Sequence, residues 1–466
     1  MLAHLCRLLL FQQIDDICKA TIMSFFQNKT TLILGMALVL VGLSLVFRSQ
    51  GNSGGMESVV IADPGTVLAS GARTSDGYSD RLIATYQDRL QNDPDDVKAL
   101  AGLGIAYLQK ARETNDPSFY TQAETALQKA LTLQADNYDA LSGMGSLELS
   151  RHNFKQAEEW GMKAREANPK KAYAYGVTGD ARIELGNYEG AIESFQQMVD
   201  LRPDLGSYSR VSYARELSGD VEGAIEAMEQ AIEAGSPAAE NTAWCRVQLG
   251  NVYFNINRLS EAEKAYGEAL RSYPDYLHAL AGLGQVRWAQ GKPDEAIKLY
   301  KQAVAKVPLP QYLTALGDMY TQQGDTVEAK EQYDLVQYIF KVFEANGVDV
   351  GAEKAAFLAD YDLDIPQAVT LVAEAAKSRN DIHTDDTLAW TLYRAGRYQE
   401  ALLAEKGALR LGTNNALFHY HLGMIQLALG DEEAARSTLQ MALGINPHFS
   451  IRYAPEARQL LDKLSK

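Results

Sequence analysis

Two different hydrophobic patterns divide this chain. Between Lys29 and Arg48 lie 18 residues without a charge, TTLILGMALVLVGLSLVF, whereas farther along the small residue alanine recurs at a nearly fixed interval. At about 1.5 Å rise per residue, the uncharged segment spans roughly 27 Å, close to the hydrocarbon thickness of a bilayer. The first pattern therefore predicts one membrane-spanning helix at residues 30–47, and the second predicts a repetitive helical fold.

The charges that flank the apolar segment set its expected orientation. Arg7, Lys19 and Lys29 precede it and Arg48 follows it. Because positive charge is retained on the cytoplasmic side, this excess places the N-terminus in the cytoplasm and the C-terminal part outside it. The alternative is a cleaved signal peptide, which usually has an apolar region of about 7–15 residues directly before a small-x-small site. Here RSQGNSGG follows instead, so a membrane anchor is the favoured interpretation.

The segments on either side of the predicted anchor differ in composition. Residues 1–29 contain a second methionine, Met23, and the 22 residues before it are either an over-extended gene start or a short amphipathic helix. Residues 48–78 are rich in Gly and Ser and sparse in charge, which is typical of a flexible linker with a reach of about 30 Å. We expect this linker to let the folded part move relative to the bilayer surface.

Alanine is the most regular feature of the rest of the chain. It stands at positions 123, 157, 191, 224, 262, 296, 329, 368, 401 and 435, with gaps of 33 to 39 residues. Prolines follow several copies, and each should end a helix because its ring removes an amide donor and clashes with the preceding turn. These prolines are Pro169, Pro203, Pro274, Pro308 and Pro447. Pairs such as Gly186-Asn187 and Gly430-Asp431 predict the turn inside each unit.

Large residues complete the pattern of each unit. They lie near four positions after the alanine, as Phe195, Tyr266, Tyr300 and Tyr333, and Leu-Gly pairs such as Leu103-Gly104 and Leu283-Gly284 mark the preceding helix. Small residues at the close approach of two helices, with large ones filling the gap to the next pair, resemble the tetratricopeptide repeat. The resemblance covers about three quarters of the chain. It implies an all-α, right-handed superhelical solenoid of about ten helix pairs.

The resemblance also sets the expected boundaries of the solenoid. The helix pairs should occupy residues 97–449, with a capping half-repeat at 79–96 and a capping helix in 450–466. Two units depart from the pattern. The first has an insertion from Glu113 to Ser118 in its inter-helix turn, and the eighth has Ala355-Ala356 in place of Leu-Gly after an extended connection.

Charge and motifs exclude several classes of function. With 44 Lys and Arg against 60 Asp and Glu, the net charge is −16, which argues against a nucleic-acid partner because such a protein needs a basic face. Cys6, Cys18 and Cys245 form no CxxC pair, and the motifs HExxH and GxxxxGK are absent from the sequence. The one GxSxG match, GNSGG at residues 51–55, lies in the Gly- and Ser-rich predicted linker and not between a strand and a helix, as a catalytic serine would require. We therefore expect no enzymatic activity, no cofactor and no small-molecule substrate.

Other residues that suggest chemistry have a simpler interpretation. The GLG triplets at 102–104 and 282–284 lie inside predicted helices, so they are interpreted as close-packing glycines rather than a dinucleotide motif. His419 and His421 are two positions apart on a predicted helix and so face different ways, which is unfavourable for shared metal ligation. We predict no metal site.

Two acidic pairs also have a structural interpretation. Asp385-Asp386 and Glu432-Glu433 stand at predicted helix starts, where negative charge complements the helix dipole. Acid–base catalysis by these carboxylates is a remote second choice.

The concave surface of the predicted solenoid is the candidate binding site. In proteins that this one resembles, certain first-helix positions contact the ligand. Carried over, they are Trp244, Asn251, Phe254, Asn255, His278, Gln285 and Trp288 in the fifth and sixth units, and His383, Trp390, Tyr393 and Arg394 in the ninth. Aromatic anchors mixed with amides suit an extended peptide. The alternative that several of these aromatics simply pack between helices remains open.

Charged residues on the same face bear on the chemistry of the partner. Asp180, Glu184 and Asp318 belong to the third and seventh units and favour a basic or polar partner. Val247 and Gly282 stand where a clamp for a C-terminal carboxylate would need basic residues.

The sequence thus predicts a membrane-anchored scaffold that binds a protein in its groove. The alternative is an accessory factor in cell-envelope or polysaccharide assembly that binds a glycan or an enzyme partner, because aromatic grooves also stack sugars.

Overall fold

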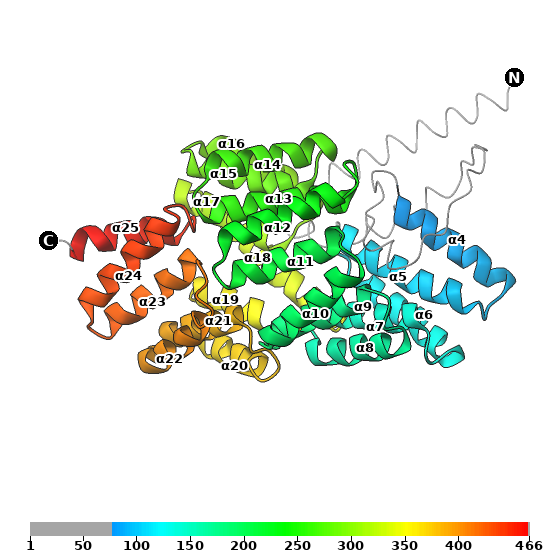
Figure 1. Cartoon of the computed structure of the whole chain (residues 1–466). Helices are drawn as coiled ribbons and strands as arrows, with labels where there is room; N and C mark the ends of the chain where they lie inside the picture. Colours follow the sequence, from blue (N-terminus) through cyan, green and yellow to red (C-terminus); the bar gives the residue numbers. More distant parts are fainter. Residues whose placement is uncertain (1–76, 465–466) are drawn as a thin grey trace, which may run out of the picture. The chain divides into compact units, whose positions relative to one another are not determined.

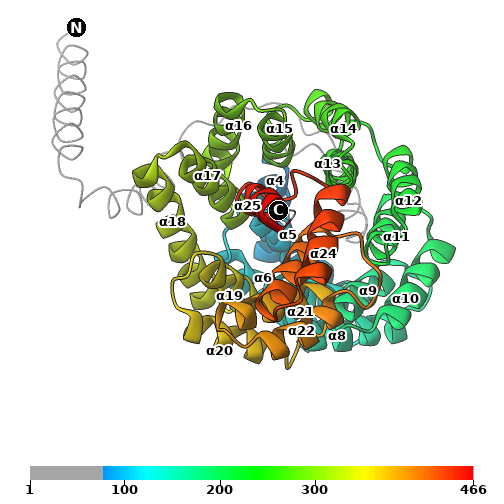
Figure 2. The same cartoon turned by 90° about the vertical axis from the view of Figure 1, so that its left-hand side faces the viewer.

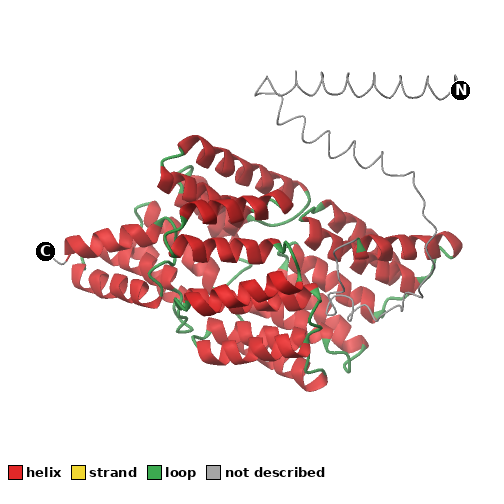
Figure 3. Ribbon diagram, turned by 90° about the horizontal axis from the view of Figure 1, so that it is seen from above, coloured by secondary structure: helices red, strands yellow, loops and turns green. Residues whose placement is uncertain are grey.

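The computed structural model describes residues 77–464, and all regular structure in that range is α-helical (Figure 1, Figure 3). The predicted anchor at 30–47, the segment 1–29 and nearly all of the predicted linker lie outside the described residues. Of the helices in the described range, none combines the length and the apolarity needed to cross a bilayer.

The described helices are numbered α4 to α25. Their bounds are α4 Tyr78–Asn92, α5 Val97–Thr114, α6 Ser118–Leu133, α7 Tyr138–Ser150, α8 Phe154–Ala167, α9 Tyr173–Glu184, α10 Tyr188–Leu201, α11 Leu205–Leu217, α12 Val221–Ala234, α13 Glu240–Asn255, α14 Leu259–Ser272, α15 Leu277–Ala289, α16 Pro293–Lys306, α17 Pro310–Gln323, α18 Thr326–Ala345, α19 Gly351–Asp360, α20 Ile365–Ala375, α21 Ile382–Arg394, α22 Tyr398–Ala408, α23 Ala416–Ala428, α24 Glu432–Ile445 and α25 Tyr453–Leu464.

The helices associate as hairpin pairs that stack in sequence order. Each first helix, from α5 to α23, packs against the second helix that follows it, and each pair packs against the next. The pair α17 and α18 meets the pair α19 and α20 through an apolar cluster in which Leu313 and Phe340 join Phe357. Helix α4 packs on α5 without a partner of its own, and α25 packs on α24. The expected all-α repeat solenoid is therefore confirmed.

The recurring alanines are the closest points of approach within the pairs. All ten lie on second helices, and each exposes 3% or less of its surface. A methyl group at this position lets two helix backbones approach closely, whereas a larger side chain would hold them apart. The repeat period in the sequence thus reports a packing requirement.

The Gly-Asn and Gly-Asp pairs predicted as turns lie between the two helices of a unit. Gly186, Gly219 and Gly430 adopt left-handed backbone conformations, with φ of 73°, 78° and 85°. The next residue is Asn or Asp in each case, and its side chain accepts a hydrogen bond of 3.1 Å from the third amide of the following helix. Glycine therefore ends the first helix without strain, and the polar residue caps the second.

Two local expectations are corrected. Of the insertion expected in the inter-helix turn of the first unit, Glu113 to Ser118, only residues 115–117 form the turn, because α5 continues to Thr114 and α6 begins at Ser118. The extended connection expected before the eighth unit is largely helix, because α18 continues to Ala345. The reason is that Val336, Ile339 and Phe340 keep an apolar face at helical spacing, and all three are buried.

The solenoid winds back on itself. In Figure 2, helices α8 to α22 follow one another around a ring. Besides the backbone hydrogen bonds from Asp349 N to Arg151 O and from Asn380 N to Glu184 O, four hydrogen bonds made by side chains join the ring to the next turn across 192 to 197 residues. They link His152 to Asp349, Glu184 to Arg379, Tyr188 to Ile382, and Phe254 to Asn446.

These turn-to-turn contacts, which we call the seam, follow a regular rule. The turn inside units two, three and four meets the connection that leads into units eight, nine and ten. The contacts are close, because a Cβ on Gly186 would lie 2.4 Å from the carbonyl oxygen of Asn380. Apolar side chains add to them, since Ile183 and Phe195 share a cluster with Ile382 and Phe418.

Candidate partner-binding channel

A large cavity runs along the inside of the solenoid. Its volume is about 1840 Å³. Its walls come mainly from the first helices of eight consecutive pairs, α5, α7, α9, α11, α13, α15, α17 and α19, with single residues from second helices and connections and with residues 448–451. Cavities for drug-sized ligands measure roughly 300–1,000 Å³. The channel is therefore large enough for an extended chain rather than a small molecule.

Six of the predicted contact residues gather at one stretch of this channel. Trp244, Phe254, His278, Gln285 and Trp288 line the large cavity. Trp244, His278 and Gln285 also line an adjoining cavity of about 350 Å³, together with Asn251. The fold thus brings the candidates of the fifth and sixth units together on α13 and α15.

Within this group, the side chains differ in what they can offer a partner. Phe254 exposes 2% of its surface and belongs to the core. The Asn251 amide is engaged inside the protein, because Tyr266 donates to its Oδ1 at 2.8 Å and its Nδ2 donates to Gln248 at 3.2 Å. Within residues 77–464, by contrast, the indole nitrogens of Trp244 and Trp288 and the amide of Gln285 make no hydrogen bond.

The remaining candidates lie outside the linings of both cavities. Asn255 is exposed and donates to Glu216 at 3.3 Å. Arg394 lies 3.5 Å from Asp362 in an ion pair, and His383 packs edge-on against Phe418 at 5.4 Å between ring centroids. The ninth unit therefore does not join the candidate site of the fifth and sixth.

Trp390 and Tyr393 show the packing alternative directly. The Trp390 ring is 4% exposed, stacks on Tyr393 at 4.9 Å between centroids, and donates from Nε1 to Asp360 at 2.8 Å. Trp390 is held inside the domain by an aromatic stack and a satisfied indole nitrogen.

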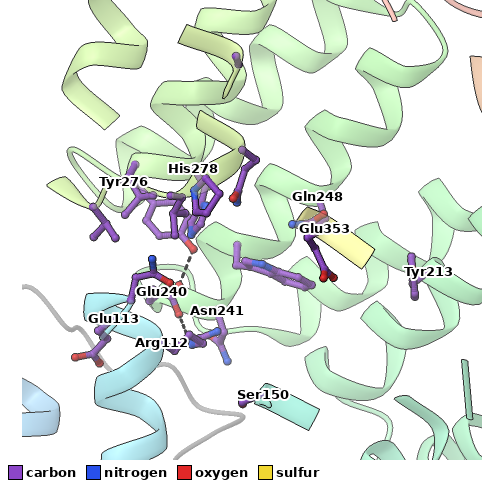
Figure 4. A pocket seen from close by; sticks show the side chains of 18 of the residues that line it. Arg112, Glu113, Ser150, Tyr213, Glu240, Asn241, Gln248, Tyr276, His278 and Glu353 are labelled. Atoms are coloured by element: carbon purple, nitrogen blue, oxygen red, sulfur yellow. Dashed lines mark hydrogen bonds and ion pairs between the residues drawn. The ribbon is translucent and has the colours of Figure 1, made fainter. Parts of the chain in front are cut away.

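A polar network made by Arg112, Glu240 and Tyr276 lines the channel (Figure 4). Arg112 from α5 forms an ion pair with Glu240 at the start of α13, and the Tyr276 hydroxyl donates to the same carboxylate at 2.6 Å. Glu240 is buried, and a buried carboxylate with a cation and a hydroxyl donor is a satisfied one. Sequence reasoning missed this pair because its members are 128 residues apart.

His278 sits at the edge of this network and is held in its neutral form. Its Nδ1 lies 2.6 Å from the Tyr312 hydroxyl. Burial lowers the pKa of His278 to about 4, with Arg112 lowering it further and Glu240 opposing the shift. A neutral imidazole has one donor and one acceptor nitrogen, so His278 contributes polarity to the channel without charge.

The three predicted acidic residues of the inner face do line the channel, but they have partners. Arg210 donates to Asp180 from Nε at 2.8 Å and from Nη2 at 2.7 Å. Burial raises the pKa of Asp318 to about 6, although Tyr361 and Tyr333 donate to it at 2.7 and 2.9 Å. The channel is therefore less negative than the residue types alone imply.

Comparison with known proteins identifies the repeats. The family model described as tetratricopeptide repeat matches residues 163–206, 247–309, 282–339 and 387–448. The chain thus contains tetratricopeptide repeats, as its alanine period predicts. Proteins built from such repeats are typically interaction scaffolds.

Similarity to individual proteins is limited to parts of them. The chain is 24% identical over 275 residues to cellulose synthase operon protein C of Pseudomonas fluorescens (strain SBW25), which covers 54% of this chain and 19% of that protein. It is 25% identical over 205 residues to the CTR9 homolog of Arabidopsis thaliana, covering 42% and 19%. The chain spans about a fifth of the length of these curated relatives. A solved structure, the human IFIT1 dimer with PPP-AAAA, is 16% identical with a TM-score of 0.44, covering 82% of this chain and 93% of that one.

Proposed function

We propose that this chain is a non-enzymatic scaffold whose channel binds an extended segment of a protein partner. The observation that carries the proposal is the continuous cavity of about 1840 Å³ along eight first helices. A surface built from repeated helices is arranged before the partner arrives, so little free energy is lost in ordering it. Many shallow contacts along the channel then add up to specific recognition.

The stretch of channel on α13 and α15 is the proposed centre of recognition. Trp244 and Trp288 offer aromatic surface and unused indole donors, and Gln285 offers both a donor and an acceptor. An extended peptide needs pockets for its side chains and hydrogen-bond partners for its backbone. This combination supports a peptide ligand whose backbone forms hydrogen bonds with the Gln285 amide and whose side chains contact the indole rings of Trp244 and Trp288.

The proposed scaffold works at a membrane. Residues 30–47 would anchor it with the N-terminus in the cytoplasm and the repeats outside, as the flanking charges favour. Confinement raises the effective concentration of a partner that is held at the same membrane. Proximity labelling from the C-terminus in cells would report both the side of the membrane and the neighbouring proteins.

The binding surface is tested by substitution. Replacing Trp244, Gln285 and Trp288 together by Ala should weaken capture of the labelled partner at least tenfold, because aromatic anchors dominate such interfaces. Binding is measured by titration with the full chain, and circular dichroism checks that helicity is retained. Trp160→Ala is the matched control, since Trp160 lies on α8 and lines neither cavity. Equal capture by the triple variant and the wild type would contradict the proposed surface.

A second candidate function is supported by one comparison. The match to a cellulose synthase operon protein covers 54% of this chain, and aromatic side chains in a groove can stack on sugar rings. This candidate is an accessory role in polysaccharide assembly. A glycan array separates the two: retention of a β-linked glucan that is lost in the triple variant supports the carbohydrate role, and a blank array excludes direct glycan binding.

A further inference from the structure

Three side chains that commonly bind metals meet inside the ninth and tenth units. Asp386 lies on α21, Glu405 on α22 and His421 on α23, and their exposed fractions are 7%, 0% and 3%. One ligand atom from each residue lies within 4.8 Å of those of the other two. The cluster lies apart from the channel, because none of the three residues lines either cavity.

The hydrogen bonding inside this cluster is incomplete. His421 Nδ1 lies 2.7 Å from Asp386 Oδ1. Both carboxylate oxygens of Glu405, and Nε2 of His421, have no hydrogen-bond partner within the described part of the chain. Burying an ionised carboxylate without a hydrogen-bond partner is strongly unfavourable, because the charge loses its solvation by water. The buried carboxylates therefore need compensation, either by a proton that they share or by a cation bound between them.

We propose that Asp386, Glu405 and His421 bind a divalent transition-metal cation of the zinc type. Two carboxylates and one neutral imidazole supply two negative charges, which balance the charge of such an ion. Carboxylate oxygen and imidazole nitrogen are both ordinary zinc ligands, with bonds of about 2.0–2.2 Å. In tetrahedral geometry those bonds place ligand atoms roughly 3.3 Å apart, so small side-chain movements bring the three residues into position.

The surroundings of His421 hold its ring in place for this role. Trp390 stacks on the His421 ring at 4.2 Å between centroids and an interplanar angle of 15°. The indole is itself fixed by its hydrogen bond to Asp360. Residues that orient a ligand in this way tune metal affinity. Because the ligands come from both helices of one pair and the first helix of the next, the ion would fasten the ninth unit to the tenth.

The full chain, treated with a chelator and dialysed, is titrated with CoCl₂ and separately with ZnCl₂. We expect one equivalent of Co²⁺ to bind with the visible d–d absorption of a low-coordinate nitrogen and oxygen site. We also expect Zn²⁺ to displace it and to raise the melting temperature. Glu405→Gln, which keeps the shape of the side chain, should weaken Zn²⁺ binding at least tenfold. The control is His419→Ala, two residues away on α23 and outside the cluster, and it should bind as the wild type does.

Two results would overturn the metal site. One is a wild-type chain that takes up no Co²⁺ and melts at the same temperature with and without Zn²⁺. In that case the two carboxylates share a proton, and Glu405→Gln should melt at or above the wild-type temperature. The other is equal Co²⁺ absorption in the wild type and in His421→Ala, which would place the ion elsewhere. Because the wild-type titration gives an answer by itself, the test does not depend on the folding of any variant.

Discussion

At the scale of single residues, Tyr266 shows how glycine makes room for the large residues of the repeat. Its ring is fully buried between the fifth and sixth units. A Cβ on Gly250 would lie 2.5 Å from its Cε1, and a Cβ on Gly282 would lie 2.4 Å from the same atom. Both separations are shorter than non-bonded carbon atoms allow. Gly282, the first glycine of the GLG triplet at 282–284, is therefore a packing position, as its place inside a helix predicts.

Gly282→Ala should lower the free energy of unfolding by about 1–3 kcal/mol, because the added methyl group displaces a fully buried ring. The change is measured as a fall in the midpoint of denaturant unfolding. Gly444→Ala is the matched control: Gly444 also lies in a helix, and a Cβ there meets nothing within 4 Å. That variant should be neutral or slightly stabilising, since alanine favours helix. A Gly282→Ala variant as stable as Gly444→Ala would contradict the packing argument.

At the scale of helices, the sequence predicts which segments are helical better than it predicts what they contact. The alanine period, the prolines and the Gly-Asn and Gly-Asp turns act within one unit, so the ten helix pairs follow from local patterns. Trp390 and Trp288 both lie on first helices and are both predicted from the sequence to contact a partner, yet Trp390 is buried and Trp288 lines the channel. That difference depends on which later helix covers each residue, and no repeat motif encodes it.

Contacts between residues of different units could not be predicted from the sequence for the same reason. Arg112 and Glu240 pair across 128 residues, and Asp386, Glu405 and His421 meet from three helices. Considering His421 only with its helix neighbour His419 could not reveal a cluster formed between units. The long α18 was missed for a different reason, because its extra turns follow no repeat position and are recognised only from their apolar spacing.

The caps of the second helices carry a prediction at this scale. Asp431 accepts a 3.1 Å hydrogen bond from the Ala434 amide at the start of α24. Asp431→Ala should cost about 1 kcal/mol of stability, since that amide loses its partner. Asp431→Asn keeps an acceptor oxygen and should restore most of the loss in a thermal melt. Equal melting temperatures for Asp431→Ala and the wild type would show that the cap contributes nothing.

At the scale of the whole repeat domain, the seam makes stability depend on pH. Glu184 lies beside Arg379 at 3.2 Å in the seam. Burial raises the pKa of Glu184 to about 7, the carboxylates of Asp381, Glu353 and Asp180 raise it further, and Arg379 opposes them. The folded chain thus holds a proton that the unfolded chain releases near pH 4.5. Stability must therefore fall as the pH rises between these two values.

Glu184→Gln should flatten this dependence, because the amide mimics the protonated carboxyl at every pH. Melting temperatures measured from pH 5 to pH 8 should decline less in the variant than in the wild type. The exposed Glu193 on α10 provides the control, and Glu193→Gln should leave the decline unchanged. Parallel declines in wild type and Glu184→Gln would mean that this carboxyl does not control the seam. The pKa of Asp318 is also raised. We therefore expect the melting temperature of Glu184→Gln still to decline slightly with rising pH.

The seam also limits how the extended segment of a protein partner can enter the channel. Units two, three and five are fastened to the segments six places later through His152, Glu184, Tyr188 and Phe254, so at these units the wall is closed between one turn of the coil and the next. A strand tethered at both ends within its own folded domain cannot be inserted sideways. We expect a free tail to thread in lengthwise from an open end of the coil, and the same residues presented as an internal loop to associate far more slowly.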